Sequence, residues 1–289
     1  MRIFVVSFRI AFDAFRLFLA DDGWAIASHI ALSTLMALFP FLIVVTTLAG
    51  FFFGSQQLAN EAARLLLEAW PKEVAGPITR DVTNVLTNTR GDVLTFSVVF
   101  ALYFASSGVE SLRIGLNRAY SAVERRSWWL LRLESILYTL VGAIAILAFA
   151  FLVVLGPLIW AKLVEYFPLL QPFNRSVTLL RYGIAAAVLI IALLILHRWL
   201  PAGRREFGEI APGILATLVL WLISGALFGR YLSEFSFTYS ITYSGLASAM
   251  ITLIFLYVCS SIFIYGGELN SVIAKRHKPT RTTETQRAL

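Results

Sequence analysis

The last apolar stretch of this chain carries a stripe of polar side chains. The stripe consists of Tyr257, Ser261, Tyr265 and Glu268. Because these residues are three or four apart, a helix would place them on one face. Glu268 follows an uncharged run, 235–267. Charge inside a bilayer is costly, and the groups that persist there pair with one another or line a polar pathway.

Two other polar groups occur near the ends of apolar stretches. They are Glu110, Arg113 and Asn117 in one stretch and His29 with Ser33 in another. Together with Asn270, which follows Glu268 closely, they complete the set that we expect to border a substrate or ion pathway at one membrane face.

Two interpretations of Glu268 stay open at this level. In the first, Glu268 closes a salt bridge with Arg113 or Arg118 and fixes two helices together. In the second, Glu268 lies with Arg113 and His29 at the border of a cavity that admits a lipid headgroup, an anionic solute or a proton. The two are compatible, because a transporter can break and remake such a pair.

The residue types that catalysis requires are not grouped. The three histidines, His29, His197 and His277, show no metal-binding spacing, and the single Cys259 has no partner for a redox or metal pair. A nuclease needs an acid–base pair or metal-bound water beside the phosphate. The sequence therefore predicts no catalytic residues, no metal and no cofactor, and it argues against nuclease activity.

Composition indicates where these residues lie. Hydrophobic residues make up 58% and charged residues 14% of the chain, far below the charged fraction of about 25% in soluble proteins. The uncharged windows are 23–60, 93–109, 135–161, 182–197, 210–229 and 235–267. A spanning helix needs about 20 apolar residues. We therefore expect an all-α polytopic membrane protein with six transmembrane helices.

Basic residues set the expected orientation. With the N-terminus inside, the cytoplasmic segments carry 16 Lys and Arg and the outer segments carry 8. Basic residues are retained on the cytoplasmic side, so both termini should be cytoplasmic. The net charge of +7 then fits contact with anionic membrane lipids and needs no nucleic acid.

The remaining segments complete the expected organisation. Residues 1–22 have the pattern of a cytoplasmic amphipathic helix lying in the interface. Residues 23–274 should form the transmembrane domain, including two short outer-surface helices within 58–90. Residues 275–289 should form a disordered cytoplasmic tail.

Prolines and glycines add three local expectations. Pro40 and Pro157 are expected to kink the first and third spans. Gly225 and Gly229 form a Gly-x-x-x-Gly step that serves either a homo-oligomer or internal packing. The aromatic residues around Tyr231 and Tyr243 are expected in the loop after the fifth span, as a belt at the outer headgroups or as a gate.

Several stretches resemble one known family. They are "IALSTLMALFPFLIV", "SGVESLRIGLNRAY" and the long block from "APGILATLVLW" to "FIYGGELN". Together they are similar to the YihY/BrkB family of bacterial inner-membrane proteins, with Gly267 standing where that family is expected to have alanine. The resemblance implies a six-span protein of the bacterial inner membrane, in a family that has carried the labels ribonuclease and virulence factor.

The function expected from the residues is transport or lipid handling through a cytoplasm-facing polar site. The alternative is a structural or accessory protein of the envelope that transports nothing. A polar cavity would favour transport, and a dry core with a broad apolar flank would favour the structural role.

Overall fold

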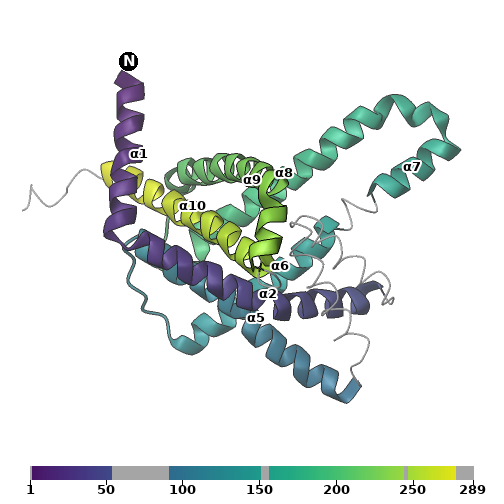
Figure 1. Cartoon of the computed structure of the whole chain (residues 1–289), viewed down its shortest axis with the longest axis horizontal. Coiled ribbons are helices and arrows are strands. Elements are labelled where there is room, and N and C mark those ends of the chain that lie inside the picture. Colours follow the sequence, from purple (N-terminus) through teal and green to yellow (C-terminus); the bar gives the residue numbers. More distant parts are fainter. Residues whose placement is uncertain (1, 54–90, 151–155, 244–246, 278–289) are drawn as a thin grey trace, which may run out of the picture.

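The computed structural model describes residues 2–53, 91–150, 156–243 and 247–277, and all regular elements in these ranges are helical (Figure 1). The expected all-α class is therefore confirmed. The outer helices expected within 58–90 and most of the tail expected at 275–289 lie outside the described residues.

A sharp turn joins α1 (Arg2–Ala20) to α2 (Gly23–Phe53). Asp22 has a φ of 57°, in the left-handed region. A Cβ at Gly23 would lie 2.4 Å from the ring of Phe18 and 2.6 Å from its carbonyl oxygen, so only glycine fits at this corner. The N-terminal helix is thus present as expected, and its place in the membrane interface stays a prediction.

The next described helix, α5 (Gly91–Ala119), packs against both α2 and α6 (Trp128–Ala150). It extends ten residues beyond the expected second span, 93–109, and carries the polar residues of 110–117 within the helix. A small buried cluster joins the three helices. It contains Val44, Val45, Ala101, Ala143 and Leu147.

An arm of three elements follows. It consists of α7 (Gly156–Tyr166), the 3-10 helix η2 (Pro168–Phe173) and α8 (Asn174–Trp199). In Figure 1 the arm reaches away from the other helices and returns through α8. Pro40 lies inside α2. Pro157 is the second described residue of α7, directly after residues 151–155, which lie outside the described ranges. The kinks expected at these two prolines stay predictions.

The two C-terminal helices, α9 (Phe207–Tyr243) and α10 (Ala247–His277), pack against each other at very short range. A Cβ at Gly213 would lie 2.1 Å from the carbonyl oxygen of Gly266, and a Cβ at Gly266 would lie 2.1 Å from Oγ1 of Thr217. These glycines let the backbones touch. Because α10 also packs against α1, α2 and α5, it is the central helix of the described bundle.

One sequence expectation about α9 is wrong. The segment around Tyr231 was expected as a loop after the fifth span, yet α9 continues through it to Tyr243. Its β-branched and aromatic residues are compatible with a helix, and no proline interrupts it after Pro212.

Four helical segments in the described ranges are long and apolar enough to cross a membrane. They are Trp128–Ala148, Pro168–Trp199, Phe207–Tyr231 and Ala249–Arg276, and Gly23–Leu38 is a shorter apolar helix. This is the pattern of a polytopic membrane protein. The expected number of six spans remains a prediction.

Candidate functional site

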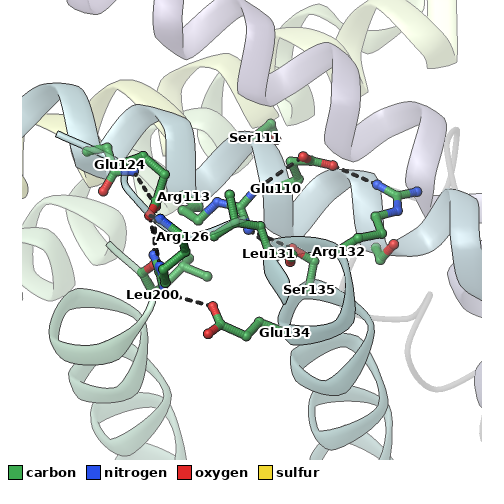
Figure 2. Close-up of polar contacts among 12 residues, drawn as sticks. Glu110, Ser111, Arg113, Glu124, Arg126, Leu131, Arg132, Glu134, Ser135 and Leu200 are labelled. Carbon is green, nitrogen blue, oxygen red and sulfur yellow. Dashed lines mark hydrogen bonds and ion pairs between the residues drawn. The ribbon is translucent and has the colours of Figure 1, made fainter. Parts of the chain in front are cut away.

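A carboxylate bridge joins α5 to α6. Glu110 Oε1 accepts a hydrogen bond from Arg113 Nη2 at 3.1 Å, and Glu110 Oε2 accepts one from Arg132 Nη1 at 2.6 Å. Figure 2 shows Glu110 between the two guanidinium groups. Arg113 and Arg132 are both buried. The spacing of Glu110 and Arg113 predicted their shared face, and the structure adds Arg132 from the neighbouring helix.

Each arginine of this bridge has further partners. Arg113 Nη1 donates to the carbonyl oxygen of Leu131 at 3.0 Å and to Ser135 Oγ at 3.2 Å. Arg132 lies over the ring of Tyr103 at 3.7 Å and donates to the carbonyl oxygen of that residue. Buried charges are stable only when they are paired and hydrogen-bonded. The bridge therefore holds α5 against α6.

A second ion-pair group lies in the connection between α5 and α6. Arg126 donates to Glu124 at 2.8 Å, to Glu134 at 2.7 Å and to the carbonyl oxygen of Leu200 at 3.1 Å (Figure 2). The hydrogen bonds from Arg126 lower the pKa of Glu124 to about 2, and those to Glu124 raise the pKa of Arg126. Glu124 is therefore ionised at neutral pH, and the connection is tied to the end of α8.

Asn117 extends this tie to the connection between α8 and α9. Its Nδ2 donates to Glu124 Oε2 at 3.2 Å, and its Oδ1 accepts from the backbone N–H of Ala202 at 2.7 Å. One side chain at the end of α5 thus holds two chain connections that are far apart in sequence.

A buried chain of hydrogen bonds crosses the same end of the bundle. Asn270 Oδ1 accepts from the backbone N–H of Gly213 at 2.6 Å, which orients its Nδ2 toward the Tyr120 hydroxyl at 3.1 Å. That hydroxyl lies 2.8 Å from Nδ1 of His197. Burial raises the pKa of Tyr120 to about 12, so its hydroxyl is protonated at neutral pH and can donate to His197.

Glu268 lies in the core without the expected partner. It is 1% exposed, and its Oε2 has no hydrogen-bond partner in the described part of the chain. Arg113 is engaged by Glu110, and Arg118 lies beside Asp21 and Asp22 at 3.6 and 3.9 Å. The salt bridge expected between Glu268 and one of these arginines is therefore not formed. Arg118 is exposed on the side of α5 nearest the turn after α1, where the two aspartates compete for it.

The other predicted pathway residues separate into different surroundings. Tyr265 donates from its hydroxyl to the carbonyl oxygen of Ala11 in α1 at 3.2 Å. Ser261 donates to the carbonyl oxygen of Tyr257 at 2.8 Å, and the Tyr257 ring lies 6.0 Å from that of Trp24. These three hydroxyl residues thus serve packing contacts along α10.

The first-span pair does not join the other polar groups. His29 is exposed on α2 and Ser33 is half-buried one turn later, whereas Glu110, Asn117 and Asn270 take part in the hydrogen bonds described above. The structure therefore brings together the polar residues of α5 and α10 with the two connections, and it leaves His29 outside them.

Two hollows open beside the connections. The larger, about 600 Å³, lies between the α5–α6 and α8–α9 connections and is lined by five arginines and one glutamate. The smaller, about 340 Å³, is lined by Tyr120, Glu209, Asn270 and Lys275 among others. Arg204 and Arg205 line both hollows.

Arg205 is the fixed element between the hollows. Its guanidinium lies 3.9 Å from the ring centre of Tyr120, its Nη2 donates to the carbonyl oxygen of Ala202 at 3.0 Å, and its Nη1 is buried without a partner in the described residues. Burial lowers the pKa of Arg205. A buried, positively charged hydrogen-bond donor without a partner favours the binding of an anion beside it.

Sequence reasoning missed the arginines of the larger hollow and Tyr120 with His197. The runs "VERR" at 123–126 and "AGRR" at 202–205 were read only as markers of orientation. The available signal was that both short basic runs are predicted to lie on the cytoplasmic side. The pairing of Tyr120 with His197 had no such signal, because 77 positions separate them.

The described residues contain no group of three or more His, Cys, Asp or Glu side chains placed to hold a metal ion. What the arrangement offers instead is ion pairing and hydrogen bonding around two hollows that arginine side chains line. Those are the means to bind an anion or to hold helices in one of two states.

Comparison with known proteins places the chain in a family. The model of the family described as virulence factor BrkB matches residues 14–288. The chain is 28% identical over 267 residues to YfkH of Bacillus subtilis, named a ribonuclease-like protein, with 92% of this chain and 95% of YfkH covered. It is 27% identical over 270 residues to a UPF0761 membrane protein of Coxiella burnetii, with 88% and 89% covered.

A third relative, a UPF0761 membrane protein of Rhodospirillum centenum, is 24% identical over 258 residues, which cover 88% of this chain and 54% of that protein. No solved structure matches the chain. Because the family match extends over almost the whole sequence, as the resemblance of the three quoted stretches predicted, this chain belongs to the BrkB family of membrane proteins.

Proposed function

We propose that this chain is a transporter or lipid-handling protein of the bacterial inner membrane, with six spans and both termini in the cytoplasm. Its polar site opens at the cytoplasmic end of the bundle and takes a lipid headgroup or an anionic solute. The excess of basic residues on that side supports the orientation.

One observation carries the proposal. The two hollows share Arg204 and Arg205, and the smaller one reaches Asn270 and Tyr120, which belong to the buried hydrogen-bond chain between α9 and α10. Arg204 and Arg205 therefore connect the hollow at the basic connections with one that reaches the central helix. Polar groups that persist in a membrane protein commonly line a substrate or ion pathway, which supports transport over a purely structural role.

The surrounding ion pairs would supply the two states that transport requires. The Glu110 bridge holds α5 to α6, while Asn270 and the glycine contact hold α9 to α10. The two helix pairs also contact each other, because α10 packs against α5 and Asn270 donates to Tyr120. Relative movement of the pairs would break and remake such contacts and so open and close a site between them.

Reconstituted protein tests this function directly. Proteoliposomes would contain a fluorescent phosphatidylglycerol, and an impermeant reductant would report its exposure at the outer leaflet. A parallel set would measure release of trapped inorganic phosphate. We expect movement in one of the two assays, reduced by Asn270→Ala and unaffected by Glu165→Gln, whose side chain is exposed on α7. No movement of either probe would remove the transport proposal.

We do not carry ribonuclease activity over from the name of the Bacillus subtilis relative. A nuclease needs an acid–base pair or metal-bound water beside its phosphate. Glu110 and Glu124 each accept hydrogen bonds from arginine, which leaves them poorly suited to act as general bases.

A structural role is the second candidate, and the surface of α8 favours it. Its side chains are largely exposed, including Leu179, Leu180 and Ile191, so this span faces lipid or another protein. Gly225 and Gly229 lie on α9, and a Cβ at either would meet no atom within 4 Å in the described structure. They are thus free to contact a second copy. Cross-linking of Gly225→Cys in a Cys259→Ala background tests this homo-oligomer.

A further inference from the structure

The larger hollow has an unusual balance of charge. Its five arginines face a single glutamate, Glu124. Glu124 pairs with Arg126, and Arg126 also pairs with Glu134. None of the other four arginines forms an ion pair with a carboxylate in the described ranges. They are Arg125, Arg198, Arg204 and Arg205. Within the described residues these four guanidinium groups therefore have no directly paired carboxylate, and Glu209 acts on Arg205 only at longer range.

Two of these guanidinium groups are held in place. Arg198 Nη1 donates to the carbonyl oxygen of Arg205 at 2.7 Å, and its guanidinium lies 4.0 Å from the ring centre of Phe207. Arg205 is fixed over Tyr120 and by Ala202, as described above. Fixed donors bind with little loss of conformational entropy.

The other two are exposed and have no side-chain partner in the described residues. Arg125 contributes only its backbone N–H, which donates to Glu124 at 3.1 Å, and the Arg204 side chain is exposed and forms no ion pair or hydrogen bond with another described residue. Arginines whose only role is to set the orientation in the membrane do not have to lie around one common space. Here two exposed guanidinium groups and two that are held in place, from the two connections and the end of α8, line one space.

The chemistry of this arrangement selects its ligand. Guanidinium groups match the oxygens of phosphate in a bidentate manner, and phosphate carries enough charge to engage more than one. A volume of about 600 Å³ lies within the usual range for small-molecule sites. Trp199, which lines the hollow and is half exposed, is a residue type that favours the headgroup level of a bilayer.

We propose that the hollow between the α5–α6 and α8–α9 connections binds a phosphate group, carried by a lipid headgroup or by a small soluble compound, through Arg125, Arg198, Arg204 and Arg205. The assignment names the ligand class of the proposed function and in that sense rests on it. Binding itself requires no movement across the membrane.

Two variants of the full-length protein test the site. The double substitution Arg125→Gln with Arg204→Gln removes two exposed charges from the hollow. The matched control, Arg16→Gln with Arg175→Gln, removes two exposed charges elsewhere, from α1 and α8. Because none of these side chains has a partner in the described structure, both doubles should unfold at the temperature of the parent protein. Thermal unfolding in detergent checks this before any binding measurement.

Two binding assays distinguish the source of the phosphate. Calorimetry with inorganic phosphate at constant ionic strength reports a soluble ligand. Native mass spectrometry with dioleoylphosphatidic acid reports a lipid ligand, and dioleoylglycerol is the control that lacks the phosphate. We expect saturable binding in at least one assay, weakened about tenfold or more in the hollow double and less than about twofold in the control double. Binding in either assay supports the site and names its source.

Three results would overturn the site. These are no saturable binding in either assay, equal weakening in both doubles, and equal binding of phosphatidic acid and dioleoylglycerol. The fate of the transport proposal is separate. If phosphate binds as expected and neither probe moves in proteoliposomes, the site stands and transport falls. If transport persists unchanged in the hollow double, transport stands and the hollow is not its ligand site.

Discussion

The side-chain oxygen of Asn270 on α10 accepts a hydrogen bond from the backbone N–H of Gly213 on α9 at 2.6 Å. At the same level the backbone of α9 at Gly213 lies against the backbone of α10 at Gly266. Pro212, directly before, cannot donate a backbone hydrogen bond at all. Side chain and backbone thus join α9 and α10 at the level where the polar hollows open.

The closeness of this contact makes Gly213 sensitive to a single methyl group. In Gly213→Ala the Cβ would lie 2.1 Å from the carbonyl oxygen of Gly266 and 2.5 Å from Asn270, so the two helices must separate. We expect a loss of about 1–3 kcal/mol in unfolding free energy, the usual cost of overpacking. Thermal unfolding in detergent measures it. Gly142→Ala, where an added Cβ meets no atom within 4 Å in the described structure, should be neutral or slightly stabilising. Equal stability of both variants would contradict the contact.

The bridge between α5 and α6 should depend on Glu110. Glu110→Gln leaves Arg113 and Arg132 without their carboxylate, and both are buried. Removing one partner of a buried pair typically costs about 3–5 kcal/mol, and the partial exposure of Glu110 places the expected loss at the lower end. Glu165→Gln breaks the exposed pair with Lys162 and should cost about 0–1 kcal/mol. Chemical or thermal unfolding of the two variants, measured in parallel, checks the difference. If the bridge does not stabilise the fold, the two variants will lose equal amounts of unfolding free energy.

Removing the carboxylate of Glu268, unlike that of Glu110, should not destabilise the fold. Its Oε2 has no hydrogen-bond partner in the described residues and neither Arg113 nor Arg118 pairs with it. The neutral Glu268→Gln should therefore unfold at or above the temperature of the parent protein, because no ion pair is broken and an amide of nearly the same size carries no charge that burial would penalise. The double substitution Glu268→Arg with Arg113→Glu should be more damaging than either single change. A marked loss in Glu268→Gln that the double restores would instead show that the pair forms.

The sequence was sufficient for the class of fold and for the helical faces, because both depend on local periodicity. It placed Glu110, Arg113 and Asn117 on one face of α5, and they do lie together. It could not say which helix packs on that face, so Arg132 was missed. Spacing fixes neighbours along one helix and carries no information on the partner across the interface.

The same limit explains the error at Glu268. Both candidate arginines were on the correct side of the bundle, yet each has nearer carboxylates, Glu110 for Arg113 and the Asp21–Asp22 turn for Arg118. The sharp turn that brings those aspartates close depends on Gly23 beneath Phe18. A choice among several carboxylates on one membrane face is made by tertiary packing, which hydropathy does not encode.

Orientation is testable through two introduced cysteines in a Cys259→Ala background. Position 76 belongs to the side with 8 basic residues and position 204 to the side with 16. We expect Gly76→Cys to react with an impermeant thiol reagent added to intact cells, and Arg204→Cys to react only after the cells are opened. The reverse pattern would place the arginine-lined hollow outside the cell and would exclude a cytoplasm-facing site.

The last prediction concerns pH, through Glu124. Its hydrogen bonds with Arg126 lower its pKa from 4.5 to about 2, so the folded protein keeps this carboxylate ionised at a pH where the unfolded chain has protonated it. The stability that Glu124 contributes is therefore fully present above about pH 4.5 and is lost as the pH falls toward 2.

At pH 7, Glu124→Gln should unfold a few degrees below the parent protein, with solvent screening keeping the difference small because Glu124 is partly exposed. That difference should narrow steadily in thermal scans at pH 5, 4 and 3. Glu206→Gln, on an exposed residue of the α8–α9 connection, supplies the control and should follow the parent protein throughout. A difference for Glu124→Gln that stays constant from pH 7 to 3 would mean that its ionised form is not what binds the α5–α6 connection to the end of α8.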